Sequence, residues 1–278
     1  MDVDILLVPY DSGVRGWRMG SGPEYLLKCG LDEHLRKRGH RVSTAQLLVD
    51  GGRRQTELQT SFELLRLIAS RVGSSVAAGR FPLIVAGNCL SACGVLAGLG
   101  AVDRTVFWFD AHGDLNTPET TVSGFVDGTA LATVLGLCWE GLCSTISGFE
   151  PVTPDRCCLI GARDLDPPEH LIIQNRGITH IAPDALPGAL NKFLARSAIH
   201  DSAGYVHCDL DVVDPSVART NCFAAPGGML PNAVLDAIDS IKKVIEVRAG
   251  AITAYEPASD PQEAVPTIAC GIAAALVE

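Results

Sequence analysis

The chain has 278 residues, of which 47% are hydrophobic and 19% are charged. This composition can bury a substantial core, and the length suits a single domain spanning residues 1–278. The net charge of −10, from 32 acidic and 22 basic side chains, argues against nucleic acid or an anionic membrane as a partner. The first residues carry acids where a signal peptide needs bases, and no apolar run is long enough to span a membrane. We therefore expect a cytoplasmic protein.

Short β-rich apolar runs alternate with helical patterns from end to end. In chain order, the expected strands are Ile5 to Val8, Arg41 to Val49, Leu83 to Ala86, Thr105 to Phe109, Cys157 to Ile160, Tyr205 to Cys208 and Ala251 to Tyr255. Pro23 to Arg38, followed by Gly39, reads as a helix with a glycine stop, and Thr56 to Ala78 as a long amphipathic helix. This alternation predicts an α/β fold with a mostly parallel central sheet and helices on both faces.

The ten cysteines do not form a recognisable disulfide framework. They fall on apolar stretches of a mid-sized chain, and most are expected to be reduced thiols of the core. The sequence has no Cys-x-x-Cys pair, which disfavours a structural zinc knuckle.

Two acidic motifs follow predicted strands, at the edge of the sheet where ligands of such folds bind. The first is Asp110-Ala-His112-Gly-Asp114, in which one histidine and two carboxylates share one side of an extended chain. The second is Asp209-Leu-Asp211, again with both carboxylates on a common side. A single Asp-x-Asp is often only turn or capping chemistry.

Two such motifs at one crevice have a stronger implication. Asp110, Asp114, Asp209 and Asp211 would repel one another and raise their own pKa values unless cations hold them. Oxygen-rich ligation with one imidazole suits Mn²⁺ better than Mg²⁺ or zinc.

Three segments together resemble, in order and spacing, the signature motifs of arginases, agmatinases and related ureohydrolases. They are Asp110 to Pro118, Gly161 to His170 and Asp209 to Pro215. The resemblance covers most of the chain and implies the three-layer arginase fold, with two Mn²⁺ ions bridged by a nucleophilic hydroxide.

The resemblance also implies individual roles. Asp110 and Asp209 correspond to the carboxylates that bridge both metals, and His112 and Asp211 to ligands of the second. Asp114 corresponds to a ligand of the first metal that also passes the proton of the nucleophile toward the leaving amine. Glu256, after the last predicted strand, is similar to the glutamate that anchors the guanidinium, although it could instead be a solvated strand-end acid.

The chain departs from the family pattern at two positions. Cys89 stands where the histidine ligand of the first metal is expected; it is either a soft thiolate ligand or a small buried residue beside a weak site. Asp127 replaces the histidine that shuttles protons to the leaving group, and its unperturbed pKa near 3.9 suits that role poorly unless its surroundings raise it. A hydroxyguanidine, which is less basic than arginine, could tolerate both changes, and Asp127 is a candidate partner for its hydroxyl.

Substrate recognition by family resemblance involves four further residues. Asn116 and Ser123 match residues that hold the α-carboxylate, while Asp166 and Glu169 match those that read the α-amino group. These features disfavour agmatine, which lacks the α-carboxylate. The alternative for Asn116-Thr-Pro is a simple turn.

The sequence therefore predicts a binuclear manganese amidinohydrolase acting on an arginine-like amino acid. It is most similar to the amidinohydrolases of antibiotic biosynthesis that convert N-hydroxy-L-arginine into L-ornithine and hydroxyurea. The alternatives are L-arginine hydrolysis, agmatine hydrolysis, and a metal-poor arginase-like protein with a binding role. The expected partner is a small amino-acid substrate; a homo-oligomer is possible but undecided.

Overall fold

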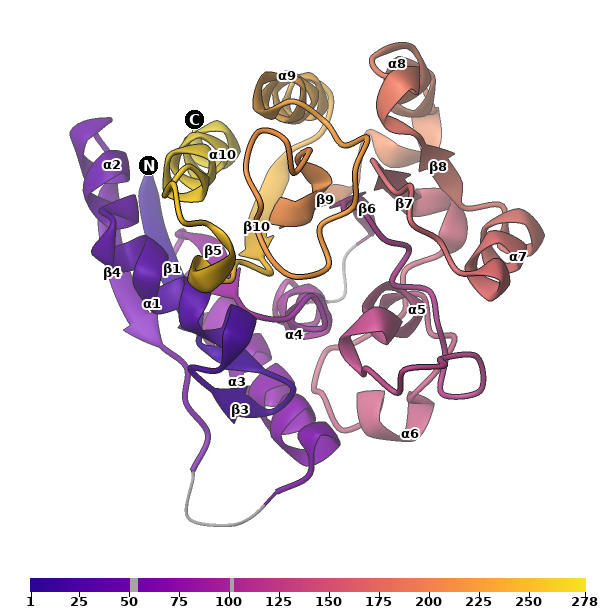
Figure 1. The fold of residues 1–278 in the computed structure, drawn as a ribbon, viewed down its shortest axis with the longest axis horizontal. Helices are drawn as coiled ribbons and strands as arrows, with labels where there is room; N and C mark the ends of the chain where they lie inside the picture. The colour runs from indigo at the N-terminus through magenta and orange to yellow at the C-terminus, as the bar shows by residue number, and fades with distance from the viewer. Residues whose placement is uncertain (51–54, 101–102) are drawn as a thin grey trace.

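Eight strands form one sheet in which every paired neighbour runs parallel (Figure 1). The structure is a computed structural model and describes residues 1–50, 55–100 and 103–278. The strands are β1 (Asp2–Val8), β4 (Arg41–Gln46), β5 (Phe81–Ala86), β6 (Arg104–Phe109), β7 (Cys157–Ile160), β8 (Thr179–Ile181), β9 (Ala203–Asp209) and β10 (Val247–Thr253). Their order across the sheet is β4-β1-β5-β10-β9-β6-β7-β8. A small antiparallel hairpin, β2 (Tyr10–Asp11) with β3 (Val14–Arg15), is separate.

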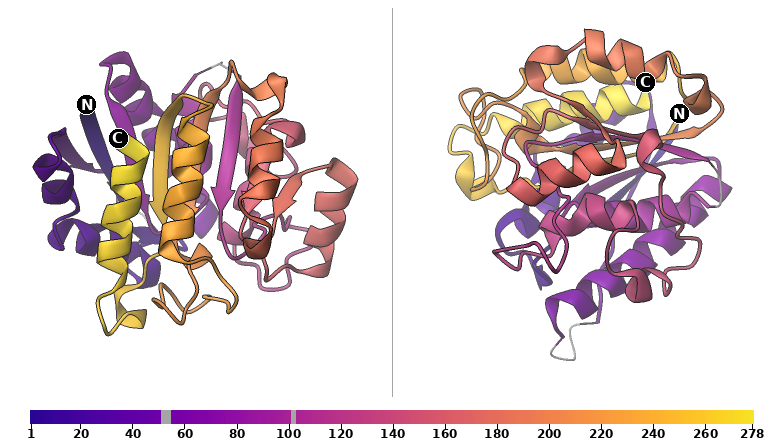
Figure 2. Two further views of the ribbon diagram at one scale, coloured as in Figure 1. Left: turned by 90° about the horizontal axis from the view of Figure 1, so that it is seen from above. Right: turned by 90° about the vertical axis from the view of Figure 1, so that its right-hand side faces the viewer.

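Helices cover both faces of this sheet (Figure 2). One core contains side chains from α1 (Gly22–Lys28), α2 (Leu31–Lys37), α8 (Gly188–Leu194), α9 (Pro231–Lys242) and α10 (Val265–Val277). The other contains side chains from α3 (Glu57–Ala77), α4 (Ser91–Gly98), α5 (Ala130–Val134), α6 (Glu140–Cys143) and α7 (Pro167–Arg176). The predicted three-layer α/β fold with a parallel sheet is thus confirmed.

Local sequence signals explain most of these elements. The central strands β5, β6, β7 and β9 are buried along their whole length, as expected of apolar runs covered on both faces. Helix α3 begins at a capping box in which Thr56 and Gln59 satisfy each other's backbone N–H groups. The predicted strand from Arg41 ends at Gln46 instead of Val49.

The helix predicted from Pro23 to Arg38 is wrong as a single element. The chain forms α1 and α2, separated at Gly30, whose φ of 90° lies in the left-handed region. A residue in that conformation cannot continue a right-handed helix, and glycine adopts it without a steric cost. The short edge strand β8 and the β2–β3 hairpin were not predicted.

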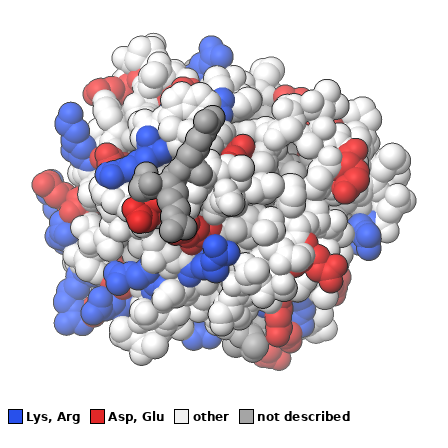
Figure 3. Space-filling model, turned by 90° about the horizontal axis from the view of Figure 1, so that it is seen from below, with Lys and Arg blue, Asp and Glu red and all other residues white. Residues whose placement is uncertain are grey.

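The sheet order decides where the acidic motifs meet. Strands β5, β10, β9 and β6 are consecutive neighbours, so the segments after their carboxyl ends converge on one crevice. On the face drawn in Figure 3, acidic and basic side chains are interspersed. Among the described residues, no helix is both long and apolar enough to cross a membrane.

Candidate metal centre and active site

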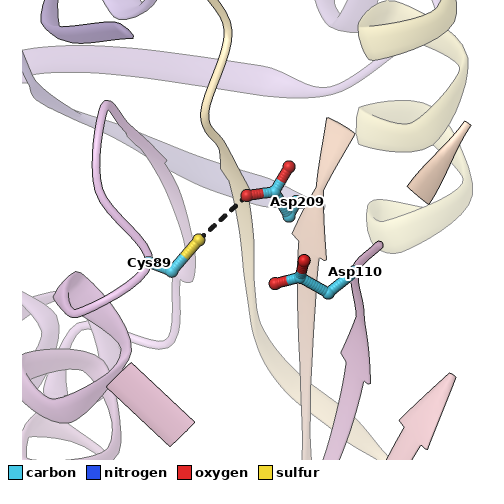
Figure 4. A group of neighbouring side chains, drawn as sticks. All are labelled: Cys89, Asp110 and Asp209. Carbon is cyan, nitrogen blue, oxygen red and sulfur yellow. Dashed lines mark hydrogen bonds between the residues drawn. The ribbon is translucent and has the colours of Figure 1, made fainter. Parts of the chain in front are cut away.

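The first group of potential metal ligands comes from three strand ends. Cys89 follows β5, Asp110 follows β6 directly, and Asp209 is the last residue of β9. All three are buried, and one ligand atom from each lies within 4.8 Å of the others (Figure 4). The Cys89 thiol donates to Oδ2 of Asp209 at 3.1 Å, so the side chains converge as the sequence predicted.

A second group adjoins the first and consists of Asp110, His112 and Asp211, again within 4.8 Å of one another. Nδ1 of His112 lies 3.3 Å from Oδ1 of Asp110 and 3.3 Å from Oδ2 of Asp211. Asp110 belongs to both groups, which is the geometry expected of a carboxylate shared by two cations. Asp209 belongs to the first group and is linked to the second because its Oδ1 accepts from the backbone N–H of Asp211.

Asp114 is buried and lines a cavity onto which Cys89, His112 and Asp209 also open. Its Oδ2 has no hydrogen-bond partner among the described residues, although buried carboxylate oxygens are nearly always satisfied. The backbone of Asp114 is also unusual, because its φ of 51° lies in the left-handed region. A cation bound in the cavity beside Asp114 would supply the missing partner.

The charges of these residues are not balanced within the protein. Burial, reinforced by neighbouring carboxylates, raises the pKa values of Asp110, Asp114 and Asp209. Burial also opposes ionisation of Asp211, but protonated His112 beside it holds the pKa of Asp211 below its usual range. Carboxylates and one imidazole are donors that suit an oxygen-preferring divalent cation, so the residues present fit two such ions.

Cys89 is held as a thiol in this arrangement. Besides its bond to Asp209, Sγ lies 3.3 Å from the hydroxyl of Thr253, which in turn lies 3.2 Å from Nε2 of His207. Burial, followed by the charge of Asp209, raises the pKa of Cys89 well above its usual range. Both interpretations of Cys89 therefore persist, since a cation would have to displace this proton before the sulfur could ligate.

Asp127 lines the cavity and is tied to the chain just before α4. Its Oδ2 accepts from the side chain of Asn88 and from the backbone N–H of Cys89, both at 2.9 Å, and its Oδ1 accepts from Leu90 at 2.7 Å. Burial raises the pKa of Asp127 to about 7, against the effect of these donors. The value is close to the range that proton transfer at neutral pH requires.

The predicted substrate-binding residues line the cavity, with one exception. Asn116 donates to Oδ2 of Asp166 at 2.8 Å, and Glu169 accepts from the backbone N–H groups of Leu115 and Asp166. Ser123 lies on an exposed loop that also lines the cavity. Together these contacts join the segment after β6 to the first turn of α7.

Glu256 is the exception, because it is not among the residues that line the cavity. Its carboxylate accepts from Ser259 at 2.9 Å. The residue after β10 that faces the cavity is Ala254. A guanidinium-anchoring role for Glu256 stays a prediction, which this conformation does not support.

The cavity has a volume of about 280 Å³, and several of its residues were not identified from the sequence. Asn221 donates to Oδ2 of Asp211 at 3.2 Å and to the carbonyl of Ala254 at 2.9 Å. Phe125 and Phe223 stack with ring centroids 5.5 Å apart, and both line the cavity. An asparagine and two phenylalanines on separate loops carry no local signal of a site, so only the fold reveals them.

An α/β fold whose cavity adjoins two groups of potential metal ligands is typical of metal-dependent hydrolases. The model of the Arginase family matches residues 1–277. The chain belongs to this family, whose members are binuclear metal-dependent hydrolases of guanidino C–N bonds.

Individual relatives agree with this assignment. The chain is 30% identical to an arginase of Bacillus caldovelox over 233 residues, which cover 78% of each protein. It is 32% identical to the N(omega)-hydroxy-L-arginine amidinohydrolase of Streptomyces lavendulae over 170 residues, 60% of this chain and 58% of the relative. The crystal structure of an arginase from Bacillus cereus superimposes with a TM-score of 0.89 at 25% identity, covering 100% of this chain and 99% of the other.

Proposed function

We propose that this amidinohydrolase acts on N-hydroxy-L-arginine and releases L-ornithine and hydroxyurea, with two Mn²⁺ ions as its cofactor. The observation that carries the proposal is the combination of Cys89 and Asp127 at one cavity whose other metal-binding residues follow the family pattern. The similarity to the Streptomyces lavendulae hydroxyarginine amidinohydrolase supports the same substrate.

The ligand sets follow from the two groups of side chains. Asp110 and Asp209, with Cys89, would hold the first cation, and Asp110, His112 and Asp211 would hold the second. The family resemblance adds Asp114 to the first set and Asp209 to the second, and the buried Oδ2 of Asp114, which has no partner among the described residues, supports the first addition. When bound, a pair of divalent cations lowers the pKa of water and thereby supplies a nucleophile near neutral pH. Oxygen ligands with one imidazole favour Mn²⁺.

In the reaction, water adds to the guanidino carbon, and the bond from that carbon to the side-chain nitrogen of ornithine breaks. The leaving nitrogen takes a proton, and hydroxyurea is the second product. Asp114 is suited to hold the proton lost by water, since its Oδ2 has no other partner among the described residues. Asp127 lines the same cavity and has a pKa of about 7, so it can pass a proton near neutral pH.

The preference for a hydroxyguanidine has a physical reason. The hydroxyl group lowers the basicity of the guanidine, so the neutral form is reached more easily near working pH. Asp127 accepts three hydrogen bonds in this structure, and a carboxylate has about four acceptor positions, which leaves capacity for the substrate hydroxyl.

Hydrolysis of L-arginine is the second candidate function. It is favoured by the Bacillus caldovelox arginase, whose similarity extends over a larger share of both chains. Agmatine hydrolysis is disfavoured because it leaves the predicted α-carboxylate site empty. A third candidate is not an enzyme but an arginase-like binding protein that holds little metal. The protonated thiol of Cys89 is the observation in its favour.

A cytoplasmic location is part of the same proposal. All ten cysteines are free thiols, and six of them are buried, which suits a reducing compartment.

The decisive experiment measures ornithine release from N-hydroxy-L-arginine and L-arginine, and putrescine release from agmatine, with Mn²⁺ added or removed by a chelator. We expect the highest kcat/KM for N-hydroxy-L-arginine and no turnover without metal. A higher kcat/KM for L-arginine than for N-hydroxy-L-arginine would instead support the assignment as an arginase. No turnover of any substrate, together with no metal in the purified protein, supports the binding role.

A further inference from the structure

The charge of the cavity poses a problem for an amino-acid substrate. Among the described residues that line it are seven carboxylates, namely Asp114, Asp127, Asp164, Asp166, Glu169, Asp209 and Asp211, but no lysine or arginine. Two cations can balance the acids at the base, and an α-amino group can pair with those near α7. The α-carboxylate of the substrate, however, would enter an acidic surrounding without a positive partner.

The residues predicted to hold that carboxylate are neutral and already hydrogen-bonded. Oδ1 of Asn116 accepts from Thr120 at 3.0 Å, while its amide donates to Asp166. The Ser123 hydroxyl accepts from the backbone N–H of Phe125 at 3.2 Å. Neither residue compensates the negative charge of a substrate, so a cation close to this loop would stabilise the bound carboxylate further.

Arg18 is such a cation. Its guanidinium carbon lies 5.6 Å from the ring centroids of both Phe125 and Phe223, and 4.1 Å from that of Trp17. These distances are within the range of cation–π attraction. The two phenylalanines line the cavity, as does Met19, the next residue after Arg18. Arg18 therefore stands at the aromatic mouth of the cavity, beside the loop that carries Ser123.

The guanidinium is held in a set orientation. Nε and Nη2 of Arg18 donate to the two carboxylate oxygens of Asp11 at 2.9 and 3.1 Å. Asp11 is fully buried, whereas 24% of the Arg18 side chain is exposed. A guanidinium carries two more N–H groups on Nη1, so one edge can pair with Asp11 and another can face a second anion.

The backbone of Arg18 gives an independent indication. Its φ of 41° lies in the left-handed region, where a side chain other than glycine or asparagine costs about 1 kcal/mol or more. Such strain is retained mainly where the side chain has a function.

We propose that Arg18 binds the α-carboxylate of the substrate and so selects amino acids over their decarboxylated analogues at this site. This inference rests on the proposed amino-acid substrate and assigns its carboxylate a cationic partner. The stacked rings of Phe125 and Phe223 hold the guanidinium at the mouth and limit its contact with water, which strengthens a charge-assisted hydrogen bond to the ligand.

The test compares the binding of L-ornithine and putrescine, which differ only in the carboxylate, to the Mn²⁺-loaded protein by calorimetry. Arg18→Gln is expected to weaken ornithine binding by about tenfold to a hundredfold, the range for a hydrogen bond to a charged group. Putrescine binding should stay within about twofold. Arg15 pairs with Glu24 at the surface, so Arg15→Gln is the matched control. It should leave the binding of both ornithine and putrescine unchanged.

A second variant covers the risk that Arg18→Gln leaves Asp11 buried and unpaired. The double variant Asp11→Asn with Arg18→Gln removes both charges and should show the same loss of selectivity in a folded protein. Equal weakening of both ligands, no change of either, or no ornithine binding to the wild type would overturn the proposal. Because binding is measured without turnover, a failure of the hydroxyarginine assignment would be visible separately in the substrate comparison.

Discussion

The floor and the mouth of the cavity are built in different ways. The floor, here Cys89, Asp110, His112, Asp114, Asp209 and Asp211, consists of residues that end or follow neighbouring parallel strands. The mouth, here Arg18, Phe125 and Phe223, is assembled from three segments that are distant in the sequence: the start of a short 3-10 helix and two loops. Strand ends are placed by the hydrogen-bonded sheet, whereas loops can vary without disturbing it. We therefore expect the floor to define the chemistry and the mouth to adapt the cavity to a substrate.

The strongest test of this contrast removes a shared ligand of the floor. We expect Asp110→Ala or Asp209→Ala to abolish turnover and to lower the bound metal, because each carboxylate lies among the potential ligands of the first cation and Asp110 also belongs to the second group. The loss of activity should exceed about a hundredfold, which is the upper range for substituting a residue that only hydrogen-bonds to a metal ligand. Kinetics and metal analysis of both variants provide the measurement.

Asp236→Ala, at an exposed position of α9, is the control for this pair and should behave as wild type. Normal activity of Asp110→Ala in metal-depleted buffer would contradict a binuclear floor.

A smaller effect is expected where the floor departs from the family. Cys89→His should raise metal retention and the activity toward L-arginine, because imidazole suits Mn²⁺ better than a thiol that donates its proton to Asp209. Metal content and arginine turnover measure the change. Cys89→Ala separates the two interpretations of the residue, since unaltered metal content in both variants would show that Cys89 is not a ligand.

Asp127 lies between floor and mouth, and its substitution should alter specificity more than overall turnover. Asp127→Asn is expected to narrow the ratio of kcat/KM between N-hydroxy-L-arginine and L-arginine, because the acceptor for the substrate hydroxyl is weakened. It should also cost about 1 kcal/mol of unfolding free energy, since the amide oxygen cannot replace both acceptors for Cys89 and Leu90. The control Asp164→Asn should keep the ratio of the wild type. A wild-type ratio in Asp127→Asn, or an equally narrowed ratio in the control, would refute the assignment.

The smallest expected effect concerns a loop behind the floor. Asp214 accepts from the backbone N–H groups of Ser216 at 2.9 Å and Gly228 at 2.7 Å, and hydrogen bonds with Ser216 lower its pKa to about 2. A lowered carboxyl pKa stabilises the folded state above the unfolded value near 4 and loses this contribution as the pH falls toward 2. Asp214→Asn should thus lower the Tm slightly at neutral pH, with a difference that shrinks below pH 4. A difference that is constant from pH 7 to pH 3 would contradict this account.

Much of the fold and of the floor could be predicted from the sequence because their signals are local. Apolar runs mark the buried strands, and Thr56 with Gln59 marks the start of α3. The motifs Asp110 to Asp114 and Asp209 to Asp211 were expected to converge because parallel strands place their carboxyl ends at one edge. Each of these features depends on a few neighbouring residues and on the general geometry of a sheet.

Tertiary structure alone decided the rest. Two contacts join segments that are far apart in the chain: Arg18 lies near Phe125 and Phe223, and Thr253 is hydrogen-bonded to Cys89. The fold also places Ala254, and not Glu256, at the cavity wall. Loop conformation and side-chain packing place these groups, and neither has a period or spacing in the sequence. A change of a few residues in such loops redirects side chains by several ångströms, whereas the hydrogen-bonded strands beneath them keep their register.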